Sequence, residues 1–136
     1  MKLRESVKPM PATIMIIEDD EELSDILHYN LTRAGYNAVQ TWDGKVAMSA
    51  LEQEPPDLVL LDIMLPGANG WEVCRFMSES PRLKGVPIVI FTAKSAREDF
   101  DQARQFNLAG FFTKPYATAD VLRHVEKVLN TPCGRS

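Results

Sequence analysis

Short apolar runs and amphipathic stretches alternate along almost the whole chain. The apolar runs have the length of strands, and glycine or proline residues flank several of them. The stretches between them repeat leucine, isoleucine, valine or methionine at helical spacing. This alternation predicts five strands, near 12–17, 36–41, 55–65, 85–93 and 110–114, and five helices, near 20–35, 43–54, 69–77, 95–110 and 117–130.

The first helical stretch has clear internal and terminal signals. Leu23, Ile26, Leu27 and Leu31 recur at helical spacing, which predicts a helix over this stretch. Gly35 gives the helix a C-terminal stop, because glycine readily adopts the left-handed conformation found there.

The strands read as continuous apolar runs and not as alternating apolar and polar positions. Such runs belong to a sheet that is covered on both faces. With a helical crossover between successive strands, the predicted architecture is an α/β fold with a doubly wound parallel sheet. The ligand site of such a sheet lies outside the carboxyl ends of its strands. The residues that end the strands are therefore the candidates for chemistry.

Polar side chains end four of the five predicted strands. Glu18 and Asp19 follow the first strand, Asp62 ends the third, Thr92 the fourth and Lys114 the fifth. Carboxylates brought close together repel one another unless a cation lies between them. Oxygen ligands without histidine or thiolate favour Mg²⁺. We therefore expect the three acids to hold this ion.

The other acids of the run "EDDEEL" have a simpler explanation. Asp20, Glu21 and Glu22 begin a helix, where the helix dipole favours negative charge. Asp62 is different, because a carboxylate at the end of a central apolar strand is costly to bury unless it is paired or coordinated. Beside a metal ion and the Lys114 ammonium group, it is suited to attack a phosphorus atom and to hold an acyl phosphate.

Composition narrows the class of protein further. The chain has 136 residues, of which 45% are hydrophobic, enough for one domain at 12–130 between a flexible leader at 1–11 and a tail at 131–136. A net charge of -4 argues against direct binding of nucleic acid or of an anionic membrane. Cys74 and Cys133 lack metal-ligand spacing and are expected as free thiols. No stretch is apolar enough for a membrane span, so we predict a cytoplasmic protein.

The residues at the strand ends, with the segments around them, resemble the receiver domain of two-component response regulators. The segments "IMIIEDD", "LVLLDIMLPGANGWEVC", "IVIFTA" and "GFFTKPY" occur in the expected order, and the resemblance covers about residues 12–130. It implies a flavodoxin-like (βα)5 fold with strand order 2-1-3-4-5. It also implies a phosphoacceptor protein that catalyses only its own phosphorylation and dephosphorylation.

The resemblance assigns roles to the acids around the metal. Asp62 is similar to the family's phosphorylation site. Asp19 and Asp62 are similar to its direct Mg²⁺ ligands, together with the backbone carbonyl of Met64. Glu18 is similar to the family's other acid, which acts through water.

The remaining implied roles concern the phosphoryl group and the response to it. Lys114, the Thr92 hydroxyl and the backbone N–H of Ala93 would contact phosphoryl oxygens. Thr92 would move toward the phosphate and Phe111 would turn inward, which changes the face built from the fourth helix, fifth strand and fifth helix. Met64 and Lys94 occupy the two positions that tune how long the phosphate lasts.

The implied partners are a sensor histidine kinase or a phosphotransfer protein, and a downstream effector or output domain. Dimerisation through the face between the fourth and fifth helices stays open. Two alternatives also remain. One is a degenerate module that binds partners without phosphorylation. The other is a Mg²⁺-dependent phosphohydrolase of the haloacid-dehalogenase type, but the position of its second acid is Met64 here, and a cap insertion is lacking.

Overall fold

A single parallel sheet organises the molecule. The structure is a computed structural model that describes residues 11–93 and 101–130. Its strands are β2 (Thr13–Ile17), β3 (Asn37–Thr41), β4 (Leu58–Asp62), β5 (Ile88–Ala93) and β6 (Gly110–Lys114). They lie in the order β3-β2-β4-β5-β6. Numbered along the chain this is 2-1-3-4-5, so the predicted flavodoxin-like fold is confirmed.

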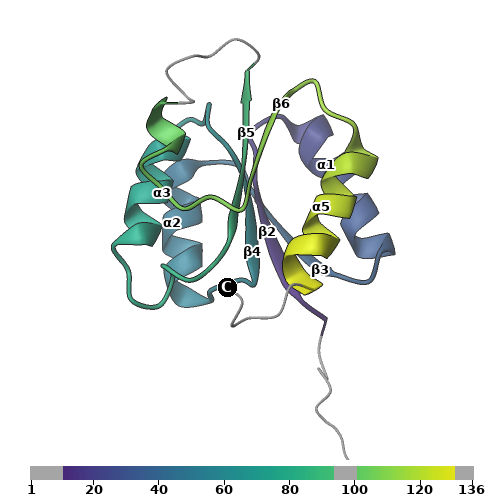
Figure 1. Ribbon diagram of the computed structural model, residues 1–136, viewed down its shortest axis with the longest axis horizontal. Coiled ribbons are helices and arrows are strands. Elements are labelled where there is room, and N and C mark those ends of the chain that lie inside the picture. The colour runs from purple at the N-terminus through teal and green to yellow at the C-terminus, as the bar shows by residue number, and fades with distance from the viewer. Residues whose placement is uncertain (1–10, 94–100, 131–136) are drawn as a thin grey trace, which may run out of the picture.

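Helices cover both faces of this sheet. They are α1 (Glu21–Arg33), α2 (Gly44–Gln53), α3 (Gly70–Ser78) and α5 (Thr118–Asn130). Helices α2 and α3 lie on one face, and α1 and α5 lie on the other (Figure 1). Most of the predicted fourth helix cannot be compared, because residues 94–100 lie outside the described residues; residues 101–103 are helical.

The sheet separates two apolar cores. One lies under α2 and α3 and includes Met15, Leu61 and Cys74, and the other lies under α1 and α5 and includes Leu27 and Phe91. Successive residues of a strand point to opposite faces, so adjacent residues of the central strands feed different cores. Strand β4 is buried along its whole length, as its continuous apolar sequence predicts.

Side-chain caps begin the three helices that follow β2, β3 and β4. Asp20, Asp43 and Asn69 are extended residues whose side chains accept hydrogen bonds from backbone N–H groups in the first helical turn. Each cap turns the chain from a strand end into a crossover helix. The caps therefore fix the loops that surround the carboxyl edge of the sheet.

One apolar residue of α1 faces solvent. Ile26 is 42% exposed, although its spacing matches that of Leu27 and Leu31. Ser24 takes the inward position, where its hydroxyl oxygen accepts a hydrogen bond from Gln40 Nε2 at 2.9 Å. The buried stripe of the helix therefore runs through positions 24, 27 and 31.

No helix in the described part of the chain has both the length and the apolar character needed to cross a membrane.

Candidate functional site

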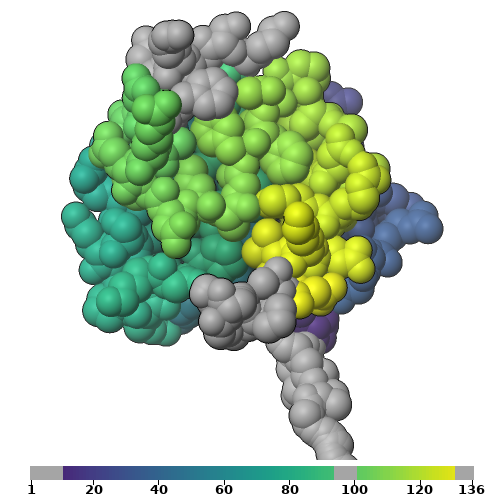
Figure 2. Space-filling view, viewed as in Figure 1, coloured from purple at the N-terminus to yellow at the C-terminus, as the bar shows by residue number. Residues whose placement is uncertain are grey.

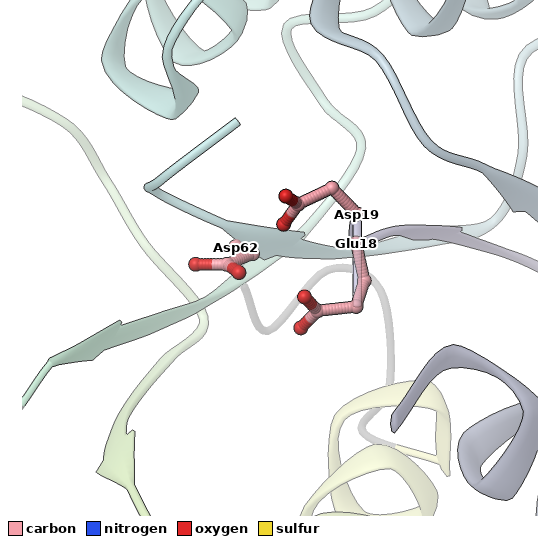
Figure 3. Close-up of side chains that lie close together, drawn as sticks. All are labelled: Glu18, Asp19 and Asp62. Atoms are coloured by element: carbon pink, nitrogen blue, oxygen red, sulfur yellow. The ribbon is translucent and has the colours of Figure 1, made fainter. Parts of the chain in front are cut away.

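Three carboxylates meet where β2 and β4 end. Strand β2 ends at Ile17, so Glu18 and Asp19 follow it directly, and Asp62 is the last residue of β4. Ile17 pairs with Leu61 across the two strands, which brings both strand ends to the same level. Figure 3 shows the carboxylates of Glu18 and Asp19 turned toward Asp62. We call these three residues the acidic site.

The acidic site is compact and partly buried. Each residue offers a carboxylate oxygen, and these oxygens lie within 4.8 Å of one another. Glu18 and Asp62 are 1% and 3% exposed, whereas Asp19 is exposed. The site therefore has two inner carboxylates and one that faces solvent.

Lys114 joins the two inner carboxylates from the edge strand β6. Its Nζ atom donates to Asp62 Oδ2 at 2.9 Å and to Glu18 Oε1 at 3.1 Å. Burial alone would lower the pKa of this ammonium group, but its hydrogen bonds and charge interactions with Asp62 and Glu18 raise the pKa above the usual value. Lys114 is therefore a fixed positive charge beside Asp62.

One ammonium group does not balance the negative charge of the acidic site. Burial and the neighbouring Asp62 carboxyl together raise the pKa of Glu18 to about 7, against the lowering effects of the backbone hydrogen bond from Asp20 and of the Lys114 charge. An acid that holds its proton near neutral pH marks a place where more positive charge would be stabilising. The donor set, three carboxylate groups without nitrogen or sulfur, fits Mg²⁺ in both chemistry and spacing.

The other predicted site residues lie on or next to the same strand ends. Thr92 is fully buried near the end of β5, and Ala93 is the exposed last residue of that strand. The backbone N–H of Met64 donates to Asp62 Oδ1 at 3.1 Å, while the Met64 side chain is 69% exposed. Lys94 lies outside the described residues. The residues of the acidic site and Lys114 therefore lie in contact with one another, and Thr92 and Ala93 lie at the adjacent strand end.

Phe111 lies on β6 and is half-buried. It packs against the core under α2 and α3, whereas the next residue, Phe112, packs against the core under α1 and α5. The bond between Lys114 and Pro115 is cis.

Two features near the site were missed by sequence reasoning. The first is Tyr116, whose ring packs on Phe91 with 4.7 Å between centroids and whose buried hydroxyl has no hydrogen-bond partner among the described residues. Burial raises the pKa of Tyr116 to about 12, and Glu18 adds to this effect. The sequence signal that could have placed Tyr116 near the site is its position two residues after Lys114.

The second missed feature is the close contact between the start of α2 and the loop after Asp62. A β-carbon on Gly44 would lie 2.1 Å from the backbone oxygen of Ala68, and one on Gly67 would lie 2.6 Å from the Asp43 carboxylate. The contact joins the dipeptides "DG" at 43–44 and "PG" at 66–67. Nothing in their local sequence indicates that they touch each other.

Comparison with known proteins points to one family. The model of the family described as the response regulator receiver domain matches residues 14–126. A putative response regulator from Chloroflexus aurantiacus J-10-fl is 25% identical, with a TM-score of 0.82, and the match covers 89% of this chain and 99% of that one. The signal receiver domain of a histidine kinase from Syntrophus aciditrophicus is 26% identical, with a TM-score of 0.81, and covers 89% and 95% respectively.

A third solved structure carries a ligand of interest. It is the receiver domain of a sensor histidine kinase from Pseudomonas aeruginosa PAO1, with a magnesium ion coordinated in its active-site cleft. It is 23% identical to this chain, with a TM-score of 0.81, and the match covers 89% of this chain and 99% of that one. At this identity the likeness shows a shared fold.

Proposed function

Because this chain belongs to the response regulator receiver domain family, we propose that it accepts a phosphoryl group on Asp62 from a phosphohistidine. Receiver domains interact with histidine kinases and with output domains. The proposed donor is a sensor histidine kinase or a phosphotransfer protein, and the proposed reader is a downstream effector or output domain. The carrying observation is the placement of Asp62, 2.9 Å from Lys114 and within reach of two further carboxylates.

In the proposed reaction, an oxygen of Asp62 forms a bond to phosphorus while the bond from phosphorus to the histidine nitrogen breaks. The histidine leaves as a neutral imidazole once its nitrogen holds a proton, and Asp62 becomes an acyl phosphate. Lys114 already donates to Asp62 Oδ2, so its ammonium group lies where it can pair with a transferred phosphoryl group. The chain itself therefore supplies the nucleophile and one counter-charge.

The metal would be held by Asp19, Asp62 and the backbone carbonyl of Met64, with Glu18 acting through water. When bound, Mg²⁺ supplies positive charge that reduces repulsion between the carboxylates and an incoming phosphoryl group. The Thr92 hydroxyl and the Ala93 N–H, at the end of β5, would hydrogen-bond the remaining phosphoryl oxygens. Beyond handling its own phosphoryl group, the chain is proposed to have no catalytic activity.

The proposed readout uses the face formed by β6, α5 and the segment before β6. These elements lie side by side on the surface, the segment and strand in green and α5 in yellow (Figure 2). Thr92 would shift toward the phosphoryl group and Phe111 would turn inward, so that the populations of two conformations change. Phe111 has no hydroxyl, so packing alone would hold its inward state.

The first test is the intact mass of the protein after incubation with acetyl phosphate, with Mg²⁺ or with excess chelator. We expect a gain of one phosphoryl group that requires the metal and is absent from Asp62→Asn. Asp57→Asn is the matched control, because Asp57 precedes the opposite end of the same strand and its role is a hydrogen bond from Thr13 N at 2.7 Å, which an amide oxygen also accepts.

Wild-type protein that neither gains mass nor binds beryllofluoride would contradict the proposal. That result would favour a module that binds partners without phosphorylation. A gain that persists in Asp62→Asn would place the phosphoryl group on another residue.

A further inference from the structure

The loop between β4 and α3, residues 63–69, is held at its base by its own backbone. Gly70 N donates to the Ile63 carbonyl at 2.8 Å, which closes the loop just after Asp62. A β-carbon on Gly70 would lie 2.6 Å from Ile63 Cα and 2.9 Å from the Asp62 carbonyl oxygen. Real β-carbon contacts are longer than this, so the closure requires glycine. The start of α3 therefore lies directly against the backbone of the phosphoacceptor.

The tip of the same loop is held by a different element, the start of α2. Gly44 N donates to the Pro66 carbonyl at 3.0 Å, and that carbonyl also accepts from Ala68 N at 3.0 Å. The Gly44 backbone approaches so closely that a β-carbon there would lie 2.1 Å from the Ala68 oxygen. Ala68 is itself buried. The loop therefore has no room to move toward α2.

Asp43 completes this contact. Its Oδ1 atom accepts from Lys45 N at 2.8 Å and Val46 N at 3.1 Å, which caps α2 and fixes the carboxylate. Gly67, with a φ of 85°, lies against the fixed carboxylate, where a β-carbon would be 2.6 Å from both oxygens. We call the contact of Asp43 and Gly44 with residues 66–68 the loop clamp.

Met64 lies between the two anchored parts of the loop. Its side chain is largely exposed and its N–H donates to Asp62, so the direction of its carbonyl follows the backbone on either side, together with Leu65, whose side chain packs against the core under α2 and α3. The loop clamp begins only two residues later, at Pro66. A shift of the loop tip would therefore rotate the Met64 peptide.

We propose that Asp43 and Gly44 are positioning residues for the metal: the loop clamp holds the Met64 carbonyl in the direction that Mg²⁺ binding requires. This inference rests on the proposed function, which makes that carbonyl a ligand. It adds that metal affinity depends on the start of α2, an element that contributes no ligand. Groups that orient metal ligands without touching the metal commonly change affinity about 10-fold or more when they are altered.

The test is a titration of ¹⁵N-labelled protein with MgCl₂, followed by amide chemical shifts, which report binding without any phosphoryl donor. We expect Gly44→Ala to raise the Kd for Mg²⁺ about 10-fold. Gly85→Ala is the matched control, because a β-carbon there has no neighbour within 4 Å. It should bind Mg²⁺ as the wild type does. Phosphorylation of Gly44→Ala by acetyl phosphate should recover at saturating Mg²⁺, because affinity and not the nucleophile is changed.

A second pair of variants covers the case in which Gly44→Ala does not fold. Asp43→Asn keeps the shape and the capping oxygen and should keep wild-type affinity, whereas Asp43→Ala removes the group that Gly67 packs against and should weaken Mg²⁺ binding. A folded Gly44→Ala with wild-type affinity, or equal affinities of Asp43→Ala and wild type, would overturn the inference and leave the proposed function standing. Wild-type protein without Mg²⁺ binding would instead contradict both.

Discussion

Glu18 is a residue of the acidic site whose pKa is clearly raised. It is almost fully buried beside Asp62, and its pKa is raised to about 7 from an ordinary value of 4.5. A carboxyl whose pKa is higher in the folded state favours folding while it is protonated. This contribution is fully present below pH 4.5 and is lost as the pH rises through about 7. At neutral pH and without a cation, the site therefore reduces the stability of the fold.

Metal binding should show the opposite pH dependence. A cation favours the ionised form of Glu18. The affinity for Mg²⁺ should therefore be highest above pH 7 and should decrease as the pH falls through that value. Between pH 8 and pH 6 we expect the Kd to rise about tenfold, measured by amide shifts at constant ionic strength. Glu18→Gln should remove most of this dependence. A wild-type Kd for Mg²⁺ that does not change with pH would contradict this prediction.

Met64 should govern how long the phosphoryl group persists. Its apolar side chain is exposed beside Asp62, where we expect it to disfavour a water molecule in line with the bond of the proposed acyl phosphate. We expect Met64→Asn to speed the loss of phosphate severalfold, because an amide can orient that water. The measurement is the decay of phosphorylated protein by intact mass, after removal of the donor. An unchanged decay rate would contradict the proposed role.

At the scale of elements, the caps link helix starts to the site. Helix α3 begins with a capping box, in which Asn69 Oδ1 accepts from Glu72 N and Glu72 Oε1 accepts from Asn69 N, both at 3.1 Å. Because Gly70 follows the cap directly and lies against the backbone of Asp62, the cap belongs both to the helix and to the loop that follows Asp62.

Removing this cap should cost stability. We expect Asn69→Ala to lower the free energy of unfolding by about 1 kcal/mol, as is typical for a lost N-cap. Asn69→Asp should lose much less, because aspartate is as good a cap. The measurement is urea denaturation followed by circular dichroism, with Asn107→Ala, at an exposed position, as the control. A change no larger than that of the control would mean that the capping box contributes nothing measurable.

Features of the fold and site could be predicted from the sequence where neighbouring residues in the chain determine them. The strand ends at Asp62 and Lys114 could be placed because apolar runs and turn residues are local signals, and parallel strands end at one edge. The inward position of Ser24 could not, because its hydroxyl bonds to Gln40, a residue of another element. The loop clamp could not be predicted either, because it is a contact between two segments that are distant in the sequence. Sequence periodicity describes single elements, whereas these features belong to pairs of them.

At the scale of the whole molecule, the two cores are separated by the sheet, and Cys74 lies in the core under α2 and α3. It is fully buried, and burial raises the pKa of its thiol to about 12. Almost no reactive thiolate therefore forms at pH 8, and reagents reach the sulfur only when the core opens.

Cys74 should therefore report the opening of that core. In a Cys133→Ser background, Ellman's reagent at pH 8 should label the native protein very slowly and the urea-unfolded protein at once. Conditions that stabilise the fold, such as saturating Mg²⁺, should slow the labelling further. Rapid labelling of the native protein would mean that the core opens locally at low cost.

The contacts of Lys114 have a consequence for the newly made protein. This residue bonds to Glu18 and Asp62, which precede it by 96 and 52 positions in the chain. Synthesis runs from the N-terminus, so Glu18 and Asp62 leave the ribosome well before the lysine that pairs with them. A half-made chain would therefore carry Asp62 without its counter-charge and without the edge strand β6. The proposed phosphorylation would therefore become possible only late in translation, because a truncated product has Asp62 but lacks Lys114 and β6.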